Sequence, residues 1–204
     1  MRIRGTARRA IVVSAATALG AGLIAGCTSD PPTTSEPTFS GTRATSTPSP
    51  SVSPTANVRV KPERPDAWDN VSVDGAIAVA TYFMELYGYT YATGDLESWN
   101  GLSHPDCEFC ASTRDGVNDL LSAGQLRDGG AVTIADPSAR EISPGELFSV
   151  DVAMTEAPAR VVSVSGKALT DWAPGSRYQT NVLVLRDANR WWIRGVDASP
   201  VAGS

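Results

Sequence analysis

The stretch that decides the fold is Ala76–Tyr91, AIAVATYFMELYGYTY, which predicts one long amphipathic helix. Its apolar residues recur at intervals of three and four, the spacing that places side chains along one face of a helix. They are Ala76, Ile77, Ala80, Phe83, Met84, Tyr87 and Tyr91. We expect Ser72 to cap this helix, with Asp74 in its first turn, and Gly94 to end it. Such a helix must bury its apolar face against another layer.

Two shorter helices are expected next. Asp95 is expected to cap the first, which runs through Leu96, Trp99 and Leu102. The second opens at Pro105-Asp106 and closes at Gly124. One of its faces can carry Cys107, Cys110, Ala111, Val117, Leu120 and Leu121. Gly129-Gly130 marks the expected change from helix to sheet.

Beyond this point the apolar residues recur at every second position, as in a strand with one buried face. Apolar residues at 148, 150, 152 and 154 alternate with Ser149, Asp151 and Ala153. The expected strands are 131–135, 148–154, 160–165, 176–186 and 190–196. A turn is expected at 157–158, a loop over 167–175 and a tight hairpin turn at 187–189. Residues 182–185 are apolar on both alternations, which predicts a central strand.

Helices followed by a meander of strands predict an α+β fold, with the helices packed on one face of an antiparallel sheet. This order resembles the nuclear-transport-factor-2-like superfamily, which includes SnoaL-like and ketosteroid-isomerase-like proteins. The resemblance rests on the Ala76–Tyr91 helix, the Gly94-Asp95 step and the closing strand RWWIRGV at 190–196. It implies a curved sheet and a cone-shaped domain, and by itself it implies no function.

The first 26 residues predict a signal peptide. They contain four arginines and no acid, followed by an apolar run that is too short and alanine-rich for a comfortable transmembrane helix. The segment LIAGC at 23–27 resembles a bacterial lipobox, which implies that Cys27 becomes the lipidated N-terminus. With Tyr82-Phe83 and HPDCEFC at 104–110, it makes the chain similar to a family of uncharacterised actinobacterial lipoproteins. Arg8-Arg9 leaves twin-arginine export open beside the general secretory route.

Residues 27–65 are expected to form the lipidated Cys27 and a disordered tether. Residues 28–65 hold eight of the chain's 14 prolines, many Ser and Thr, and almost no large apolar side chains. Such a segment cannot bury enough apolar surface to offset the entropy of ordering it. We interpret it as a stalk, and O-glycosylation of its Ser and Thr clusters stays open. The folded domain is expected to span 66–204, beginning at Asp66-Ala67-Trp68.

The charge of the chain restricts its partners. Removal of residues 1–26 takes away four of 17 basic residues and none of 22 acidic ones, so the formal charge falls from −5 to −9. Nucleic acid is therefore not an expected partner, because binding a polyanion requires clustered Lys and Arg. Attachment to the membrane must come from fatty acyl chains such as palmitate on Cys27, and two or three chains hold a protein stably.

Cys107 and Cys110 form an even pair once Cys27 is set aside. Residues three apart on a helix or turn can reach disulfide distance, and exported proteins favour disulfides. Two alternatives stay open: a redox pair, and a metal site formed with His104 and Asp106. His104 is the only histidine. We interpret it as a turn residue, with general acid–base work as the alternative.

The other candidate residues concern a pocket in the cone. Tyr87 or Tyr91 could supply a hydroxyl at its mouth and Asp151 a carboxylate, although no motif fixes any of them and structural roles are favoured. Trp191 and Trp192 are expected on opposite faces of their strand, one in the core and one partly exposed. Trp172 could join the exposed one in a binding surface.

These observations favour a lipid-anchored module on the extracytoplasmic face of the cell membrane. We expect it to bind an envelope protein or a small apolar ligand through the concave face of the sheet, with no cofactor and no metal. The alternative is an isomerase or hydratase that uses the cone pocket. An enzyme would need a deep cavity with a carboxylate whose pKa is shifted by burial, whereas a binding module predicts an interior filled by Tyr and Trp. A purely structural lipoprotein is a third possibility.

Overall fold

The computed structural model describes residues 57–201. The expected signal peptide, Cys27 and the tether up to residue 56 lie outside the described residues. Within 57–201, no helix combines the length and the apolar character that crossing a membrane requires. The helices are the 3₁₀ turn η1 (Asp66–Asp69), α1 (Val73–Thr93), α2 (Glu97–Leu102) and α3 (Glu108–Ser122).

The ends of α1 are those that the sequence predicts. The hydroxyl of Ser72 accepts a hydrogen bond from the N–H of Gly75 at 3.3 Å. Gly94 takes the left-handed conformation (φ 78°) and donates its N–H to the carbonyl of Thr90. The N-cap position of α2 is Leu96 rather than the expected Asp95, but Asp95 accepts from the N–H of Glu97 at 3.0 Å and so satisfies a free donor at the start of α2.

Six strands follow: β1 (Gln125–Gly129), β2 (Val132–Ser143), β3 (Leu147–Glu156), β4 (Ala159–Ser163), β5 (Ser176–Asp187) and β6 (Arg190–Pro200). All pairs are antiparallel, in a four-stranded sheet of order β2-β3-β5-β6 and a two-stranded sheet β1-β4. The prediction of a central strand over 182–185 is confirmed by β5. The expected hairpin turn is also confirmed, with positive φ at Ala188 and Asn189.

The prediction that the sheet begins after Gly129-Gly130 is wrong, because pairing already starts at Gln125. The N–H of Gly130 donates to the carbonyl of Pro158, and that of Ala157 donates to the carbonyl of Ala131. These bonds join the β1–β4 ladder to the β2–β3 ladder. Residues 157–158 are therefore not a turn, and the two glycines, with φ of 83° and 76°, bend a continuous strand pair. Of the expected short strand 131–135, residues 132–135 begin the twelve-residue β2, and residue 131 lies outside it.

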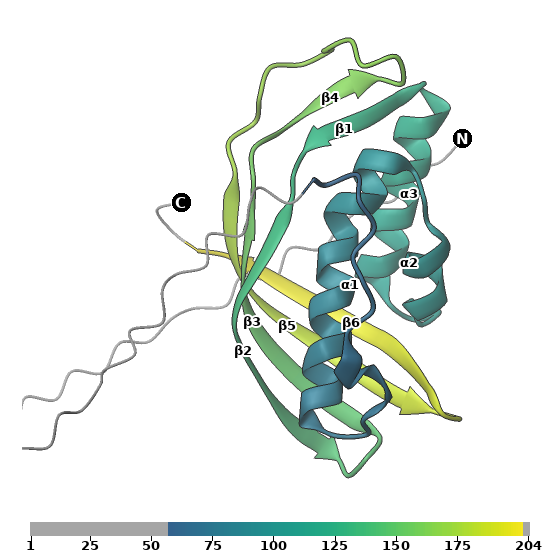
Figure 1. Cartoon of the computed structure of the whole chain (residues 1–204), viewed down its shortest axis with the longest axis vertical. Coiled ribbons are helices and arrows are strands. Elements are labelled where there is room, and N and C mark those ends of the chain that lie inside the picture. Colours follow the sequence, from purple (N-terminus) through teal and green to yellow (C-terminus); the bar gives the residue numbers. More distant parts are fainter. Residues whose placement is uncertain (1–56, 202–204) are drawn as a thin grey trace, which may run out of the picture. The chain divides into compact units, whose positions relative to one another are not determined.

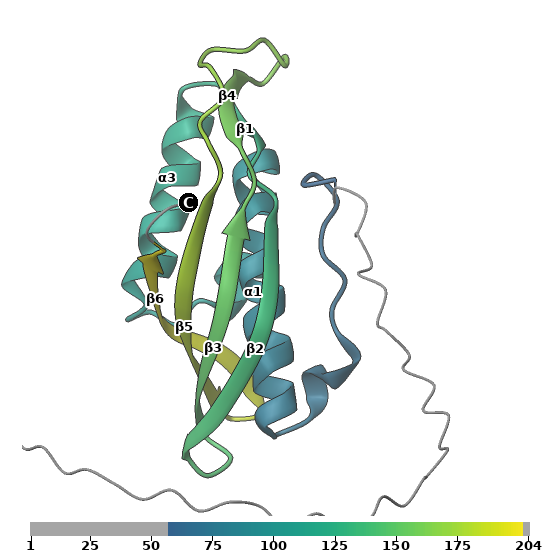
Figure 2. The same ribbon diagram turned by 90° about the vertical axis from the view of Figure 1, so that its left-hand side faces the viewer.

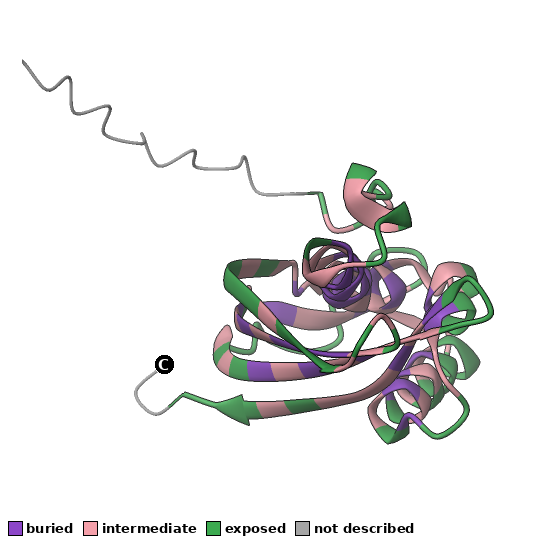
Figure 3. Ribbon diagram, turned by 90° about the horizontal axis from the view of Figure 1, so that it is seen from below, coloured by how far each residue is buried: buried purple, intermediate pink, exposed green. Residues whose placement is uncertain are grey.

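The sheet curves around α1, and all the helices lie on this concave side (Figures 1 and 2). The core lies between them, and Figure 3 shows buried residues concentrated on α1 and on alternate strand positions. Its largest fully buried side chains include Trp99, Trp191, Phe83, Phe148, Met84 and Leu86. The expected class, α+β with N-terminal helices on a curved antiparallel sheet, is confirmed.

The last nine residues of the expected tether, 57–65, lie against α1 rather than apart from the domain (Figure 2). Arg59 donates to the carbonyl of Ala92 at 2.8 Å, and Lys61 lies 3.7 Å from the carboxylate of Asp95. Order within the described chain therefore extends N-terminal to Asp66. The composition of residues 57–65 does not predict this packing, because long basic side chains make these contacts and no apolar stripe marks them.

Candidate functional site

Tyr87 and Tyr91, the tyrosines expected at the cone mouth, lie together near the C-terminal end of α1. Their ring centroids are 5.1 Å apart. The guanidinium of Arg127, on β1, lies 4.9 Å from the Tyr91 centroid and 5.8 Å from that of Tyr87. Arg127 also donates to the carboxylate of Glu156, at the end of β3. The side chains of this ion pair are only 20% and 13% exposed.

The electrostatics of this cluster keep the tyrosines protonated. Burial, reinforced by Tyr91 and Glu156, raises the pKa of Tyr87 to about 12 despite the opposing charge of Arg127. Burial also raises the pKa of Tyr91. Burial acts to lower the pKa of Arg127, but the combined effects of Glu156 and Tyr87 outweigh it and leave that pKa raised. At neutral pH these hydroxyls can donate hydrogen bonds but cannot act as bases.

Below the tyrosines, aromatic rings fill the space between α1, α2 and α3. Phe83 and Trp99 stack with centroids 4.0 Å apart. Phe109 lies 5.9 Å from Tyr87 and 6.1 Å from Trp99. The indole N–H of Trp99 donates to the carbonyl of Cys110 at 3.1 Å, so its polar atom is satisfied inside the core. The interior is therefore a packed aromatic cluster.

Asp151 does not lie with the tyrosines, and the expectation that it joins them in a pocket is wrong. It alternates with the buried residues Val150 and Val152 and therefore faces the side of the sheet away from the helices. There it accepts from Asn181 at 2.7 Å and lies 3.3 Å from Arg140. The carboxylate near the tyrosines is that of Glu156. A signal for it existed in the sequence, because Glu156 has the same parity as the apolar residues of its strand.

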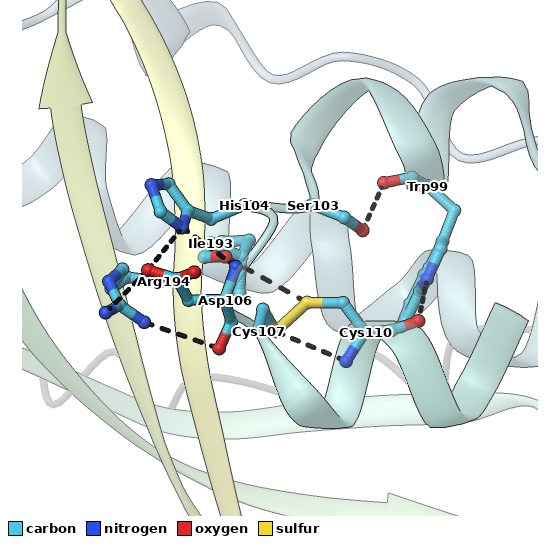
Figure 4. Close-up of a disulfide and its surroundings, with 8 residues drawn as sticks. All are labelled: Trp99, Ser103, His104, Asp106, Cys107, Cys110, Ile193 and Arg194. Atoms are coloured by element: carbon cyan, nitrogen blue, oxygen red, sulfur yellow. Dashed lines mark hydrogen bonds and ion pairs between the residues drawn. A yellow bond between two sulfur atoms is a disulfide. The ribbon is translucent and has the colours of Figure 1, made fainter.

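Cys107 and Cys110 form a disulfide with their Cα atoms 5.2 Å apart, as expected (Figure 4). Cys107 is the N-cap of α3, and its sulfur accepts from the N–H of Cys110 at 3.2 Å. Both residues are 1% exposed. A redox pair needs an accessible sulfur, and a metal site needs free thiolates, so this geometry favours the structural reading over both alternatives.

His104 lies at the surface end of the same region (Figure 4). Its Nδ1 accepts from the N–H of Asp106 at 3.2 Å, in a turn before α3. Arg194 binds the carboxylate of Asp106 at 3.0 Å. The ring of His104 packs edge-on against Trp192 with centroids 5.8 Å apart. The contacts are those of a turn residue, as the sequence predicts.

The two adjacent tryptophans of β6 lie as expected. Trp191 is 1% exposed and packs against Phe148, whereas Trp192 is half-buried on the other face. Trp172 does not join Trp192, because it lies beside Arg160 of β4, 4.5 Å from its guanidinium.

Sequence reasoning missed a pocket of about 390 Å³ at the end of the sheet where β5 turns into β6. It lies between this hairpin, η1 and α2. Three of its lining residues are arginines, Arg64, Arg186 and Arg190. No sequence motif marks it, because Arg64 and the hairpin are about 120 positions apart in the chain.

The sequence model of DUF6318, a family of unknown function, matches residues 44–197. The chain belongs to DUF6318. The match includes α1 to β5, most of β6 and the disulfide, so the DUF6318 domain contains every site described above. No curated protein is similar enough to the chain in sequence to count as a match.

Among solved structures, the DUF6318 domain is similar to the intermembrane space region of the chloroplast protein ARC6. The TM-score is 0.50 at 13% identity, covering 64% of this chain and 98% of that one. An NTF2-like protein from Cytophaga hutchinsonii gives a TM-score of 0.41 at 13% identity, covering 58% and 91%. A protein with a cystatin-like fold from Caulobacter vibrioides gives 0.39 at 12% identity, covering 61% and 85%. At such identities the first likeness concerns the fold alone.

Proposed function

We propose that this protein is a lipoprotein held on the extracytoplasmic face of the cell membrane by acyl chains on Cys27. The small residues Ala25 and Gly26 before that cysteine leave the backbone open to a processing enzyme. The disulfide in the described domain supports export, because disulfides persist in oxidising compartments. The Pro-, Ser- and Thr-rich stretch after Cys27 supports a stalk between membrane and domain.

At the envelope, the domain acts by binding rather than by catalysis. The single observation that carries this proposal is the filling of the concave face, where Phe83, Trp99 and Phe109 occupy the space that a substrate would need. Because α1 lies over the concave face of the sheet (Figure 1), we expect a ligand to bind at the edge of this face rather than at its middle. The partner is an envelope component or a small molecule.

One observation favours the competing proposal of an isomerase or hydratase: the buried polar cluster of Tyr87, Tyr91, Arg127 and Glu156. A carboxylate beside a hydroxyl donor is a recurrent acid–base arrangement. In this domain, however, the carboxylate of Glu156 already accepts a hydrogen bond from Arg127, as in a structural ion pair. A structural ion pair stabilises the fold, whereas active-site groups commonly cost stability. Replacement of Glu156 therefore distinguishes the two proposals.

The anchor is tested by expressing the full chain in a bacterium that processes lipoproteins. We expect the product to enter the detergent phase of a Triton X-114 extract, with an intact mass that corresponds to an acylated chain beginning at Cys27. The matched Cys27→Ala variant should keep its signal peptide and show no acyl mass. An unmodified mature chain, or one that begins at another residue, would overturn the anchor.

A further inference from the structure

The pocket at the β5–β6 turn concentrates positive charge on an acidic chain. Three of its lining residues are arginines, Arg64, Arg186 and Arg190, whereas Asp69 is the acidic residue of the lining. The whole chain has a formal charge of −5. Trp68, Tyr82, Leu102 and Trp191 complete the apolar part of the lining. The pocket is therefore a cationic cavity with aromatic walls.

Arg186 is the unusual member of this group. It lies directly opposite Trp191 in the β5–β6 ladder, and its guanidinium lies 4.8 Å from the Trp191 ring. Its side chain makes no hydrogen bond or ion pair to any residue in the described part of the chain, and its Nε is buried without an acceptor. Buried donors are nearly always paired, and an unpaired one on a charged group is costly. The described residues 57–201 therefore supply no acceptor for this donor.

The other two arginines are held in place beside it. Arg190 donates to the carbonyl of Gly101 at 2.5 Å and stacks 3.8 Å from the Trp192 ring. Arg64 lies 4.4 Å from the Trp68 ring, and its Nη2 lies 3.2 Å from Asp69. The indole of Trp191 donates to the carbonyl of Trp68 at 2.6 Å and so ties η1 to the hairpin. The Trp191–Trp68 bond holds η1 and the hairpin together around the pocket, and such preorganisation lowers the entropy cost of binding.

We propose that this pocket binds a small oxyanion, a ligand that carries a phosphate or carboxylate group. The Nε–H and one Nη–H of Arg186 form the planar fork that matches two oxygens of such a group. Arg64 and Arg190 add charge, and Trp68 and Leu102 contact the body of the ligand. A volume of about 390 Å³ suits a small molecule. This inference rests on the proposed binding role and names its ligand class.

The test is isothermal titration of the full chain, in a non-ionic detergent, with citrate and with inorganic phosphate. We expect saturable binding that weakens as NaCl is added. Arg186→Gln should weaken it by about tenfold or more. Arg186→Lys, which keeps the charge but not the fork, should weaken it less. Arg140→Gln is the matched control, because Arg140 is a strand arginine that pairs with Asp151 on the face away from the helices.

Vesicles containing phosphatidylglycerol, tested against neutral vesicles, distinguish a lipid phosphate from a soluble one as the source of the group. Absence of binding to all three probes, or equal binding by wild type and Arg186→Gln with unchanged circular dichroism, would overturn the proposal. Loss of the anchor on Cys27 leaves this result unaffected, because the titration does not depend on acylation. Failure of the anchor and failure of the pocket are therefore distinguishable.

Discussion

Removal of the Arg127–Glu156 ion pair is the sharpest perturbation that the fold offers. The pair connects β1 to the end of β3, across the bend at Gly129-Gly130, and its side chains are 20% and 13% exposed. Breaking a pair that is this well buried leaves an uncompensated charge, which costs about 3–5 kcal/mol. For Glu156→Gln, which keeps the shape and one hydrogen-bond acceptor, we expect the low end, about 3 kcal/mol. In a protein of this size the melting temperature should fall by about 6–12 °C.

The assay is urea unfolding followed by Trp fluorescence, with Arg140→Gln as the control. The Arg140–Asp151 pair has the same chemistry, but its side chains are 67% and 40% exposed, so its loss should cost below about 1 kcal/mol. The double variant Arg127→Met with Glu156→Leu should recover much of the loss, because no charge is left buried. A Glu156→Gln variant as stable as wild type, or more stable, would refute this reasoning and favour the enzyme proposal.

Three further predictions follow from single contacts. Replacement of both Cys107 and Cys110 by serine should lower the free energy of unfolding by about 2 kcal/mol, a modest loss because the disulfide closes a short loop. Equal stability of the oxidised, reduced and serine forms would contradict this. The pKa of Tyr87 is raised to about 12 in the fold, so its contribution to stability is present below pH ~10 and is lost as the pH rises through about 12. The free energy of unfolding, measured at increasing alkaline pH, should show this decline, and the decline should be smaller in Tyr87→Phe. An identical pH profile in wild type and variant would contradict the prediction. Gly129→Ala should lower the free energy of unfolding by ~1 kcal/mol or more beyond the loss in the control Gly124→Ala. Both glycines have positive φ, but only at Gly129 would a Cβ meet the Pro158 carbonyl. Equal melting temperatures of the two variants would exclude this close approach.

Periodicity predicted the elements that bury one continuous face. The spacing of three and four over Ala76–Tyr91 matches α1, and the two-sided apolar run at 182–185 matches the central strand β5. Periodicity could not predict the bend at Gly129-Gly130, because adjacent glycines interrupt a pattern equally at a strand start and within a strand. Two hydrogen bonds decide between these cases, from Gly130 to Pro158 and from Ala157 to Ala131, and each joins residues that are distant in the sequence.

The candidate site was less predictable than the fold. Parity along β3 distinguishes Asp151 from Glu156, because only Glu156 shares the parity of the apolar residues at 148, 150, 152 and 154. The arginine pocket forms because the β5–β6 hairpin packs against η1. The hydrogen bond from Trp191 to Trp68 joins these elements across 123 positions of the sequence. Contacts of this separation leave no local pattern in a sequence, since charged residues at 64, 186 and 190 individually resemble solvated surface.

The central claim is that the interior of the domain is a packed core and that ligands bind at the arginine pocket. Nitrogen–proton correlation spectra of the full chain, recorded while citrate is added, test it directly through the tryptophan indoles. Trp68 and Trp191 border the pocket, whereas Trp99 lies in the aromatic interior. The account predicts saturable shifts of the Trp68 and Trp191 signals, a constant Trp99 signal, and loss of the shifts in Arg186→Gln. A shift of Trp99 with unchanged Trp68 and Trp191 would contradict it.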